Sequence, residues 1–453
     1  MSQAICLPAC AGLWYNRLMR IIQTSTADSS ELSKYLDKPL LQDNREVEDA
    51  VRRILEDVRE HGDSAVLSYV RRFDWPNADS LVVPEADIDS AYSQVTDSLL
   101  DAIKSAAENI RRFHERQIRT SWFDESQDGK LLGQIILPLE RVGVLAPGFQ
   151  APLPSSVLMG AVPAKVAGVK EVVLCTPPRC DGSIHPAMAV AAREAGVDTI
   201  YRIGGAHGVA ALAYGTESVR SVDKIVGPGS LYVTMAKRFV FGAVGIDMLA
   251  GPSEILILAD ESANPRFIAA DLLSQAEHDE HARSILITTS SDLADAVRTE
   301  VERQIEDLTR SETARRSLSD NGAIIVVGSL REGIDLVNRA APEHLELAVS
   351  DPRSLLDSIR NAGAIFLGEQ TPEPIGDYIA GPNHTLPTSG TARFASPLNV
   401  DDFMKKSSVL MYSHDALVAD APAALELAQA EGLNAHANAI RVRLEGDREQ
   451  ASD

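Results

Sequence analysis

The chain has 453 residues, of which 45% are hydrophobic and 24% are charged, an ordinary composition for a globular protein. At least two domains are expected, because a single hydrophobic core stops growing at about 250–300 residues. The formal net charge of −22 argues against nucleic acid and anionic membrane as partners, because both bind clustered Lys and Arg. Four cysteines are too few for a disulfide framework, and no apolar run is long enough to cross a bilayer. We therefore expect a cytoplasmic protein.

The first part of the chain is predicted to be helical. Residues 1–18 are mildly apolar without periodicity, and we expect residues 1–40 to be an N-terminal extension. Apolar residues then recur at helical spacing. The predicted helices are Arg45–His61, Ala86–Thr96 and Leu99–Gln117.

Residues 141–244 alternate short apolar runs with helical segments. This alternation predicts parallel strands joined by crossover helices, as in a Rossmann-like, doubly wound α/β nucleotide-binding domain. Ligands bind such sheets at the carboxyl ends of the strands. Three glycine-containing turns fall there, at Pro147-Gly148, Gly204-Gly205 and Gly227-Pro-Gly229. The sequence has no G-x-G-x-x-G fingerprint, so the pattern alone does not show nucleotide binding.

A second doubly wound α/β domain follows. Its strands are predicted at 254–259, 284–288, 323–327 and 364–367. We expect it to be discontinuous and catalytic, formed by 41–140 and 245–380. The remaining segment, 381–453, is predicted to be loops and short helices at 400–406, 421–431 and 434–443. It is too small for a core of its own, so we expect it to pack on another domain or on a partner subunit as a dimerisation segment.

One predicted helix, 264–281, carries a polar stripe. Asn264 suits the N-cap, and the proline after it suits the first helical position. Ile268, Leu272 and Gln275 share one face, and His278 lies one turn further on. Two polar side chains on a face that should be buried suggest a metal or polar site. An ordinary surface helix with a polar end would explain the same pattern.

Further polar clusters stand in apolar or glycine-rich surroundings. They contain Ser253, the adjacent Glu343 and His344, Asp377 with His384, and Glu431 with His436. Glu431 lies in the last turn of a predicted helix, where a carboxylate opposes the helix dipole. Local rules of this kind are broken most often where function requires it.

These clusters belong to five motifs that together resemble the histidinol dehydrogenase family over about residues 25–445. The motifs are Gly-Pro-Ser-Glu, Asp-Leu-Leu-Ser-Gln-Ala-Glu-His, Ala-Pro-Glu-His-Leu-Glu, Gly-Asp-Tyr with Gly-Pro-Asn-His-Thr-Leu-Pro-Thr, and Glu-Gly-Leu-x-Ala-His. Five motifs in one order are far more specific than any one of them.

The resemblance implies one Zn²⁺ per site and a homodimer. The implied ligands are Gln275, His278, Asp377 and His436, the last of them from the other subunit, together with Glu431 as a residue contributed across the interface. These ligand positions are also implied substrate contacts, since the imidazole and amine of the substrate can complete the zinc shell. The metal is then mainly an orienting template.

The resemblance also implies oxidation of L-histidinol to L-histidine by two hydride transfers to NAD⁺, through an aldehyde. Glu343 and His344 match the catalytic pair, and Ser253, His384, Glu431 and His344 itself match substrate contacts. A neutral imidazole suits removal of the hydroxyl proton. The second oxidation needs an activated water, a task for the carboxylate of Glu343.

Three positions depart from the family pattern, and all are ones that the family offers to NAD. Leu145 stands for a Tyr, His207 for a Gln and Ser230 for an Asn. Leu145 loses a stacking and hydrogen-bonding partner, whereas the other two can still form hydrogen bonds. The altered positions leave NAD binding as the least secure part of the implied function.

Two other functions compete with this interpretation. A relative on the same scaffold could oxidise another small polyol, such as a sulfonated propanediol, although Glu431 disfavours a sulfonate. A catalytically silent zinc-stabilised dimer or ligand-binding protein would explain the altered cofactor segment. Calorimetry with NAD⁺ distinguishes the last possibility, because a binding protein of this kind gives no heat of nucleotide binding.

Overall fold

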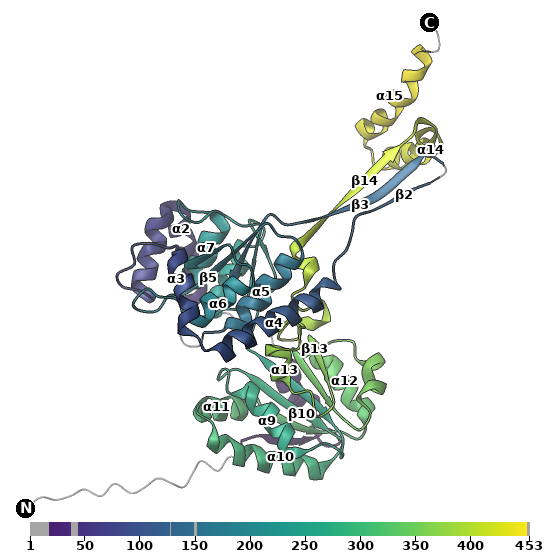
Figure 1. Ribbon diagram of the computed structural model, residues 1–453. Helices are drawn as coiled ribbons and strands as arrows, with labels where there is room; N and C mark the ends of the chain where they lie inside the picture. Colours follow the sequence, from purple (N-terminus) through teal and green to yellow (C-terminus); the bar gives the residue numbers. More distant parts are fainter. Residues whose placement is uncertain (1–17, 38–43, 127, 149–151, 451–453) are drawn as a thin grey trace, which may run out of the picture. The chain divides into compact units, whose positions relative to one another are not determined.

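The computed structural model describes residues 18–37, 44–126, 128–148 and 152–450, and these form two compact units (Figure 1). The first unit contains the described residues up to Gln117 together with Leu139–Phe403. The second contains Ile118–Pro138 and the described residues from Met404 onward. The expectation for residues 1–17 lies outside the described residues.

The first unit contains a six-stranded parallel sheet in the order β1-β11-β10-β9-β12-β13. Its central strands are short apolar runs buried on both faces, as parallel sheets require. The strands are β1 (Arg20–Gln23), β9 (Glu254–Ala259), β10 (Arg283–Thr288), β11 (Ala323–Val326), β12 (His344–Ala348) and β13 (Ala364–Leu367). Within the expected N-terminal extension, Arg20–Gln23 thus form an edge strand of this sheet.

Helices cover both faces of this sheet, because alternate residues of each strand enter two separate core clusters. One cluster includes α9, α10 and α11, and the other includes α1 and α12. These helices and their neighbours are α1 (Ser29–Leu36), α9 (Pro265–Ala276), α10 (Ser291–Gln304), η2 (Ile305–Asp307), α11 (Ser311–Asn321), α12 (Leu330–Ala340), η3 (Pro352–Ser358), α13 (Glu373–Tyr378), η4 (Thr391–Arg393) and η5 (Val400–Phe403).

A second parallel sheet in the first unit has the order β6-β5-β4-β7-β8, which confirms the doubly wound α/β class. Its strands are β4 (Arg141–Leu145), β5 (Glu171–Thr176), β6 (Thr199–Arg202), β7 (Lys224–Val226) and β8 (Gly245–Ile246). Its helices are α5 (Pro154–Val166), α6 (Pro186–Glu194), α7 (Gly205–Tyr214) and α8 (Leu231–Val240).

The helices between Arg45 and Glu115 pack on this second sheet. They are α2 (Arg45–Phe73), α3 (Glu85–Ala91), η1 (Tyr92–Gln94) and α4 (Asp97–Glu115). α2 packs on α7 and α8, α3 on α6, and α4 on α5. This packing differs from the expected association of 41–140 with 245–380. Apolar spacing shows that a helix buries one face, but not which sheet that face covers. α2 also continues past Gly62, where a positive φ of 54° marks a kink and not the expected end.

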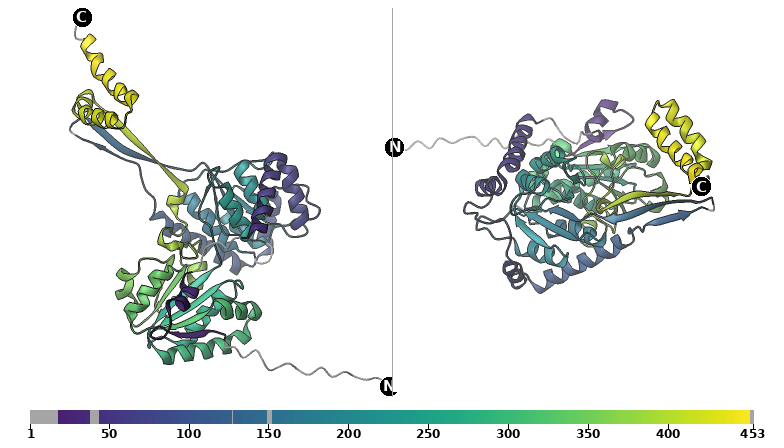
Figure 2. Two further views of the ribbon diagram at one scale, coloured as in Figure 1. Left: turned by 180° about the vertical axis from the view of Figure 1, so that it is seen from behind. Right: turned by 90° about the horizontal axis from the view of Figure 1, so that it is seen from above.

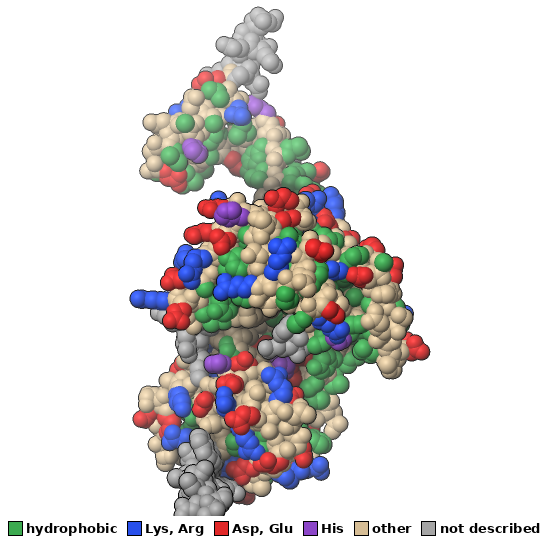
Figure 3. All heavy atoms as spheres, turned by 90° about the vertical axis from the view of Figure 1, so that its left-hand side faces the viewer, with side chains coloured by type: hydrophobic (Ala, Val, Ile, Leu, Met, Phe, Trp, Pro, Cys, Tyr) green, Lys and Arg blue, Asp and Glu red, His purple; other side chains and the backbone are tan. Residues whose placement is uncertain are grey.

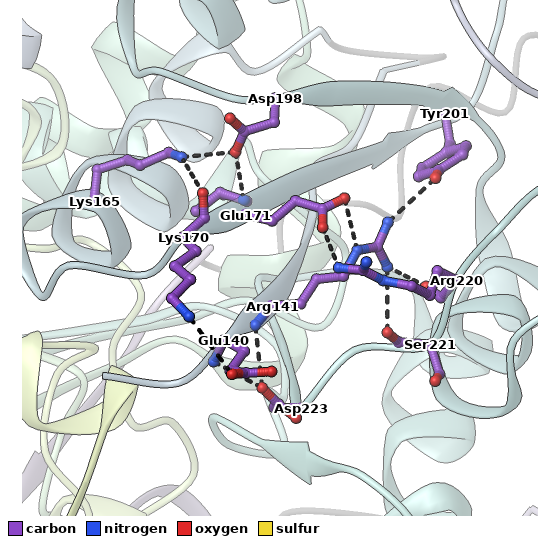
Figure 4. Close-up of polar contacts among 11 residues, drawn as sticks. Glu140, Arg141, Lys165, Lys170, Glu171, Asp198, Tyr201, Arg220, Ser221 and Asp223 are labelled. Atoms are coloured by element: carbon purple, nitrogen blue, oxygen red, sulfur yellow. Dashed lines mark hydrogen bonds and ion pairs between the residues drawn. The ribbon is translucent and has the colours of Figure 1, made fainter. Parts of the chain in front are cut away.

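Ion pairs and hydrogen bonds join the strands at the amino-terminal edge of this sheet (Figure 4). Arg141 at the start of β4 is buried, and its Nε lies 2.9 Å from Oε1 of Glu171 at the start of β5. Its Nη2 donates to the hydroxyl of Tyr201 on β6 at 3.2 Å. Its backbone N–H donates to Asp223, just before β7, at 3.1 Å. The network ties four strands together at the edge opposite the glycine-containing turns.

The second unit is an antiparallel sheet in the order β14-β3-β2 with two helices (Figure 2). Its elements are β2 (Trp122–Glu125), β3 (Lys130–Pro138), β14 (Met404–Tyr412), α14 (His414–Ala430) and α15 (Asn434–Gln450). The helix expected at 400–406 is confirmed only over η5, which ends at Phe403, and is wrong beyond it, where the chain continues as a strand. Pairing with β3 along nine residues decides the conformation of this segment, and local sequence does not reveal a pairing so distant in the chain.

The surface of the molecule carries charges of both signs. Figure 3 shows acidic and basic side chains interspersed over the face in view. Among the described residues, no helix has the length and apolarity needed to span a membrane.

Candidate active site

Polar side chains gather at the amino-terminal edge of the six-stranded sheet. β9 begins at Glu254, and β12 begins at His344 beside it. α9 starts at the opposite edge and runs back, so its last residues also reach this edge. Doubly wound sheets usually bind ligands at the carboxyl edge, so this location does not follow from the fold class.

The polar stripe is buried as predicted along α9, whereas the side chain of His278 is exposed. Ile268, Leu272 and Gln275 are 2%, 0% and 1% exposed. The helix is shorter than expected, however, because it ends at Ala276 with Glu277 as its C-cap. His278 thus lies just beyond the helix, in the turn that follows it. Leaving the helix frees this imidazole from the direction that helical geometry would impose.

His344 is at the centre of the site. Its Nδ1 lies 2.9 Å from the backbone oxygen of Glu254. A carbonyl only accepts, so Nδ1 donates and Nε2 carries the lone pair of the neutral ring. Nε2 lies 3.7 Å from Glu373 Oε1 and 3.8 Å from Asp377 Oδ1. Glu343 Oε2 lies 3.7 Å from Nδ1 and accepts the backbone N–H of Glu254 at 2.9 Å.

Two further histidines predicted from the sequence join this group. His278 interacts electrostatically with Asp377 and His344. His384 places Nδ1 3.9 Å from Asp377 Oδ2 and Nε2 3.4 Å from the hydroxyl of Ser156 on α5. The structure therefore brings together side chains that are more than 100 residues apart in sequence.

Burial and mutual charge perturb these groups strongly. Burial raises the pKa of Glu343 to about 8, with His344 opposing the rise and Glu254 adding to it. Burial disfavours the charged form of His344, but Glu343, Asp377 and Glu373 together raise its pKa to about 10. Any cation bound among these carboxyls would lower that pKa again, because it would neutralise their charge.

The remaining groups are two histidines that favour the neutral form and one carboxyl that favours the ionised form. Burial lowers the pKa of His278 and of His384, which favours the neutral imidazole that binds metals. Burial acts to raise the pKa of Asp377, but the nearby imidazoles of His344 and His384 hold that pKa below the ordinary value. Asp377 therefore remains a carboxylate.

Three further carboxyls at this site were not predicted from the sequence. Glu373 is 2% exposed at the start of α13, and its backbone N–H donates to Glu346 Oε1 at 3.1 Å. Burial raises the pKa of Glu373 to about 8, that of Glu346 well above its usual range, and that of Asp271 to about 6. Asp271 and Glu346 fall inside two of the quoted motifs, which was the available signal. Glu373 is a lone acidic residue after a proline, and nothing in the sequence distinguishes it.

The donor atoms fit a divalent metal ion. Among the buried polar atoms without a hydrogen-bond partner in the described part of the chain, three lie at this site: Gln275 Oε1, His344 Nε2 and Glu373 Oε1. A buried polar atom without a partner is costly. His344, Glu373 and Asp377 also each present one ligand atom within 4.8 Å of the others. Nitrogen and oxygen donors of this kind suit Zn²⁺.

The other predicted site residues are placed as follows. Ser253 is half-buried and directly precedes β9. Glu431 caps the end of α14, and His436 lies on α15. Both belong to the second unit, where both are exposed.

A possible cofactor site lies in the other sheet of the first unit. The strand order reverses between β4 and β7, and ligands bind doubly wound sheets at that point. Leu145 ends β4, and Gly227 follows β7 with a φ of +107°, where a Cβ atom would collide with the carbonyl of Leu145. Ser230 is exposed as the N-cap of α8.

Two of the three expected cofactor contacts have buried side chains. Leu145 is 4% exposed and packs in the core. His207 is 3% exposed, stacks with Tyr69, lies tilted against Phe73, and places Nε2 3.8 Å from Asp74. This placement differs from the expectation that these side chains face NAD. The side chain of Leu145 is buried, and its backbone lies next to the turn at Gly227. A ligand bound there would therefore contact mainly main-chain groups.

Two parallel sheets flanked by helices, with histidines and carboxyls gathered at the edge of one of them, place the chain in the class of Rossmann-like α/β proteins. A model of the histidinol dehydrogenase family matches residues 39–444. The chain is 54% identical over 427 residues to a histidinol dehydrogenase from Heliobacterium mobile, which covers 94% of this chain and 100% of that protein. A relative of the same name from Geobacter metallireducens is 56% identical over 408 residues, covering 89% and 93%.

A solved structure agrees with these relatives. The crystal structure of histidinol dehydrogenase from Elizabethkingia anophelis matches with a TM-score of 0.91 at 37% identity, covering 96% of this chain and 100% of that one. The chain belongs to the histidinol dehydrogenase family, a family of oxidoreductases.

Proposed function

We propose that this chain oxidises L-histidinol to L-histidine through L-histidinal, using Zn²⁺ and two NAD⁺, in the cytoplasm. The observation that carries the proposal is the convergence of His278, His344 and Asp377 at one edge of the six-stranded sheet. Family membership supports the substrate and favours it over another polyol. The free, buried thiol of Cys175 accords with a reducing compartment.

Gln275, His278 and Asp377 are the proposed zinc ligands within one chain. The unpaired Oε1 of Gln275 supports this choice, because it is a buried acceptor that lacks a partner. The lowered pKa of His278 supports it as well, since a neutral imidazole keeps a lone pair. When bound, Zn²⁺ would orient the imidazole and amine of the substrate and polarise its reacting oxygen.

The proton transfers fall to Glu343 and His344. Nδ1 of His344 is committed to Glu254, so Nε2 is the atom that removes the hydroxyl proton. Only the second oxidation consumes water, and Glu343 is the proposed base for it. A buried carboxyl with a pKa of about 8 is a stronger base, once ionised, than an exposed one. Ser253 and His384 are the proposed further contacts to the substrate.

NAD⁺ is the proposed hydride acceptor, bound where the strand order of the second sheet reverses. The turn at Gly227 is held firmly there. Its N–H donates to Asp247 at 2.7 Å, and its carbonyl accepts from Lys237 at 3.0 Å. Lys237 and Asp247 form a buried ion pair. Of the three positions that depart from the family pattern, only Ser230, beside this turn, has an exposed polar side chain. Ser230 is the N-cap of α8, and the N-terminus of a helix can bind an anionic group of the cofactor.

A homodimer is proposed because the second unit exposes much apolar surface. Exposed apolar surface of this kind marks interaction sites. The members with at least half of their surface exposed are Trp122, Phe123, Leu410, Met411 and Leu427. In the dimer, Glu431 and His436 of the second unit would complete the partner's site, His436 as a zinc ligand and Glu431 as a contact to the substrate ammonium.

The activity is tested by NADH formation with purified protein, L-histidinol, NAD⁺ and Zn²⁺. The proposal predicts about two NADH for each histidinol consumed, with histidine as the product. One NADH with accumulated aldehyde would contradict the two-step course. Activity with NADP⁺ alone would contradict the choice of cofactor, and no reduction of either nucleotide would contradict the proposed reaction.

The shared site predicts that two inactive variants complement each other. His436→Ala and Glu343→Gln are each expected to form little histidine. When the two are unfolded together and refolded, half of the dimers are mixed, and each mixed dimer has one intact site. About a quarter of the wild-type rate of histidine formation is therefore expected, because the two-fold dimer has two equivalent sites. A mixture no more active than its components would show that His436 acts within its own chain.

A further inference from the structure

Glu254 contacts both members of the proposed catalytic pair and has no role so far. It is 3% exposed at the start of β9, between β10 and β12. Through its backbone it donates to Glu343 Oε2 at 2.9 Å and accepts from His344 Nδ1 at 2.9 Å. One residue thus fixes the orientation of the carboxylate and the tautomer of the imidazole.

The side chain of Glu254 adds a second set of contacts. Oε1 accepts the backbone N–H of Glu343 at 3.2 Å and that of Ser389 at 3.1 Å. Residues 254 and 343 therefore exchange hydrogen bonds, each carboxylate accepting the backbone N–H of the other. The carboxylate of Glu254 joins two segments that β-sheet pairing alone would not hold together.

Backbone strain lies at both of these segments. Ala341, with a φ of 49°, and Ser389, with a φ of 54°, are the two non-glycine residues of positive φ in the described part of the chain. Ser389 is itself bonded to Glu254, and Ala341 is two residues before Glu343. Such conformations persist only where the surroundings impose them, and they gather at functional sites.

Arg283 forms a buried ion pair with the Glu254 carboxylate. Its Nη2 is bonded to Glu254 Oε2, and its Nη1 donates to the backbone oxygen of Tyr35 at 2.8 Å. Both side chains of the pair are buried, at 7% and 4% exposed. The guanidinium is thus anchored on one side to α1 and on the other to the start of β9. A buried carboxylate needs such a partner.

We propose that Glu254, held by Arg283, is a positioning residue that fixes Glu343 and His344 for the two oxidations. The inference rests on the proposed function, since it assigns Glu254 to the residues that perform that reaction. Glu254 does not touch the substrate in this account. It acts by keeping the Glu343 carboxylate and Nε2 of His344 in place.

The test compares E254Q and R283M with wild-type enzyme. The amide of E254Q must turn its NH₂ group either to Arg283 or to the two backbone N–H groups, so one set of bonds is lost. Both variants are expected to lower kcat for L-histidinol about 10²-fold, because a misplacement of about 1 Å costs that much. KM and zinc content should change little. R283K should recover part of the rate, and the double variant should be no slower than the slower single one.

R141M is the matched control. Arg141 is an equally buried arginine paired with a glutamate at a strand start, in the other sheet. It should lower the unfolding temperature without lowering kcat. The inference is overturned if E254Q folds, binds zinc and keeps the wild-type kcat, if only KM rises, or if R141M loses as much kcat as R283M.

A crystal structure of E254Q gives a readout that needs no activity. The Glu343 carboxylate or the His344 ring should be displaced relative to the wild type, and unmoved side chains would overturn the inference. Absence of histidinol oxidation by the wild-type enzyme would instead contradict the proposed function. The two failures are therefore distinguishable.

Discussion

Removal of zinc is expected to abolish histidinol oxidation and to lower the unfolding temperature. Loss of the ion leaves Gln275 Oε1 unpaired and the substrate without its anchor. Metal ions contribute several kcal/mol to such reactions, so we expect about a 10³-fold loss of kcat. Stability falls because an ion that binds only the folded dimer stabilises it. Activity, zinc content and thermal unfolding are measured before and after chelation.

His278→Ala removes one proposed zinc ligand and is expected to cause the same loss of zinc and of activity. His281→Ala is the matched control, because His281 lies three residues further on, with its side chain 76% exposed and paired only locally with Asp279. The control should retain zinc and activity. Readdition of Zn²⁺ should restore the chelated wild type but not His278→Ala. Full activity in protein shown to be metal-free would refute the zinc assignment.

Glu343→Gln is expected to separate the two oxidations. The amide keeps the size of the side chain and can still accept the backbone N–H of Glu254, so the first oxidation should survive better. The second should fall about 10²–10⁴-fold, the usual contribution of a general base. NADH per histidinol should therefore approach one, with trapped aldehyde as the product.

Assays that start from L-histidinal provide the control for Glu343→Gln. The variant should be nearly inactive on the aldehyde, while the wild type converts it to histidine. Histidine formation by the variant at the wild-type rate would remove the role that we give to Glu343.

The sequence predicted the buried parallel strands well. Glu254–Ala259 and Ala364–Leu367 have the predicted bounds, because each is a short apolar run between turn residues. β12 was missed, since His344 and Glu346 interrupt its apolar pattern at the site itself. β3 and β14 were missed because their conformation depends on pairing across more than 250 residues.

The site was predictable where residues form motifs. Gln275, His278 and Asp377 were found in that way, whereas Glu373 was not, because its role appears only when α13 places it beside His344. Position at the amino-terminal edge of the sheet also could not be predicted. The location of the site depends on where α9 ends and on how residues 341–346 and 388–389 contact β9. These are tertiary contacts, which local sequence does not reveal.

Zinc anomalous scattering from crystals grown with Zn²⁺ and L-histidinol tests the central claim most directly. The account predicts one zinc per site, bound by Gln275, His278, Asp377 and the partner subunit's His436, with the substrate completing the shell. The geometry of the protein alone offers a different set, His344, Glu373 and Asp377. Zinc bound by that second set would occupy Nε2 of His344, and so would contradict the base role and the mechanism built on it.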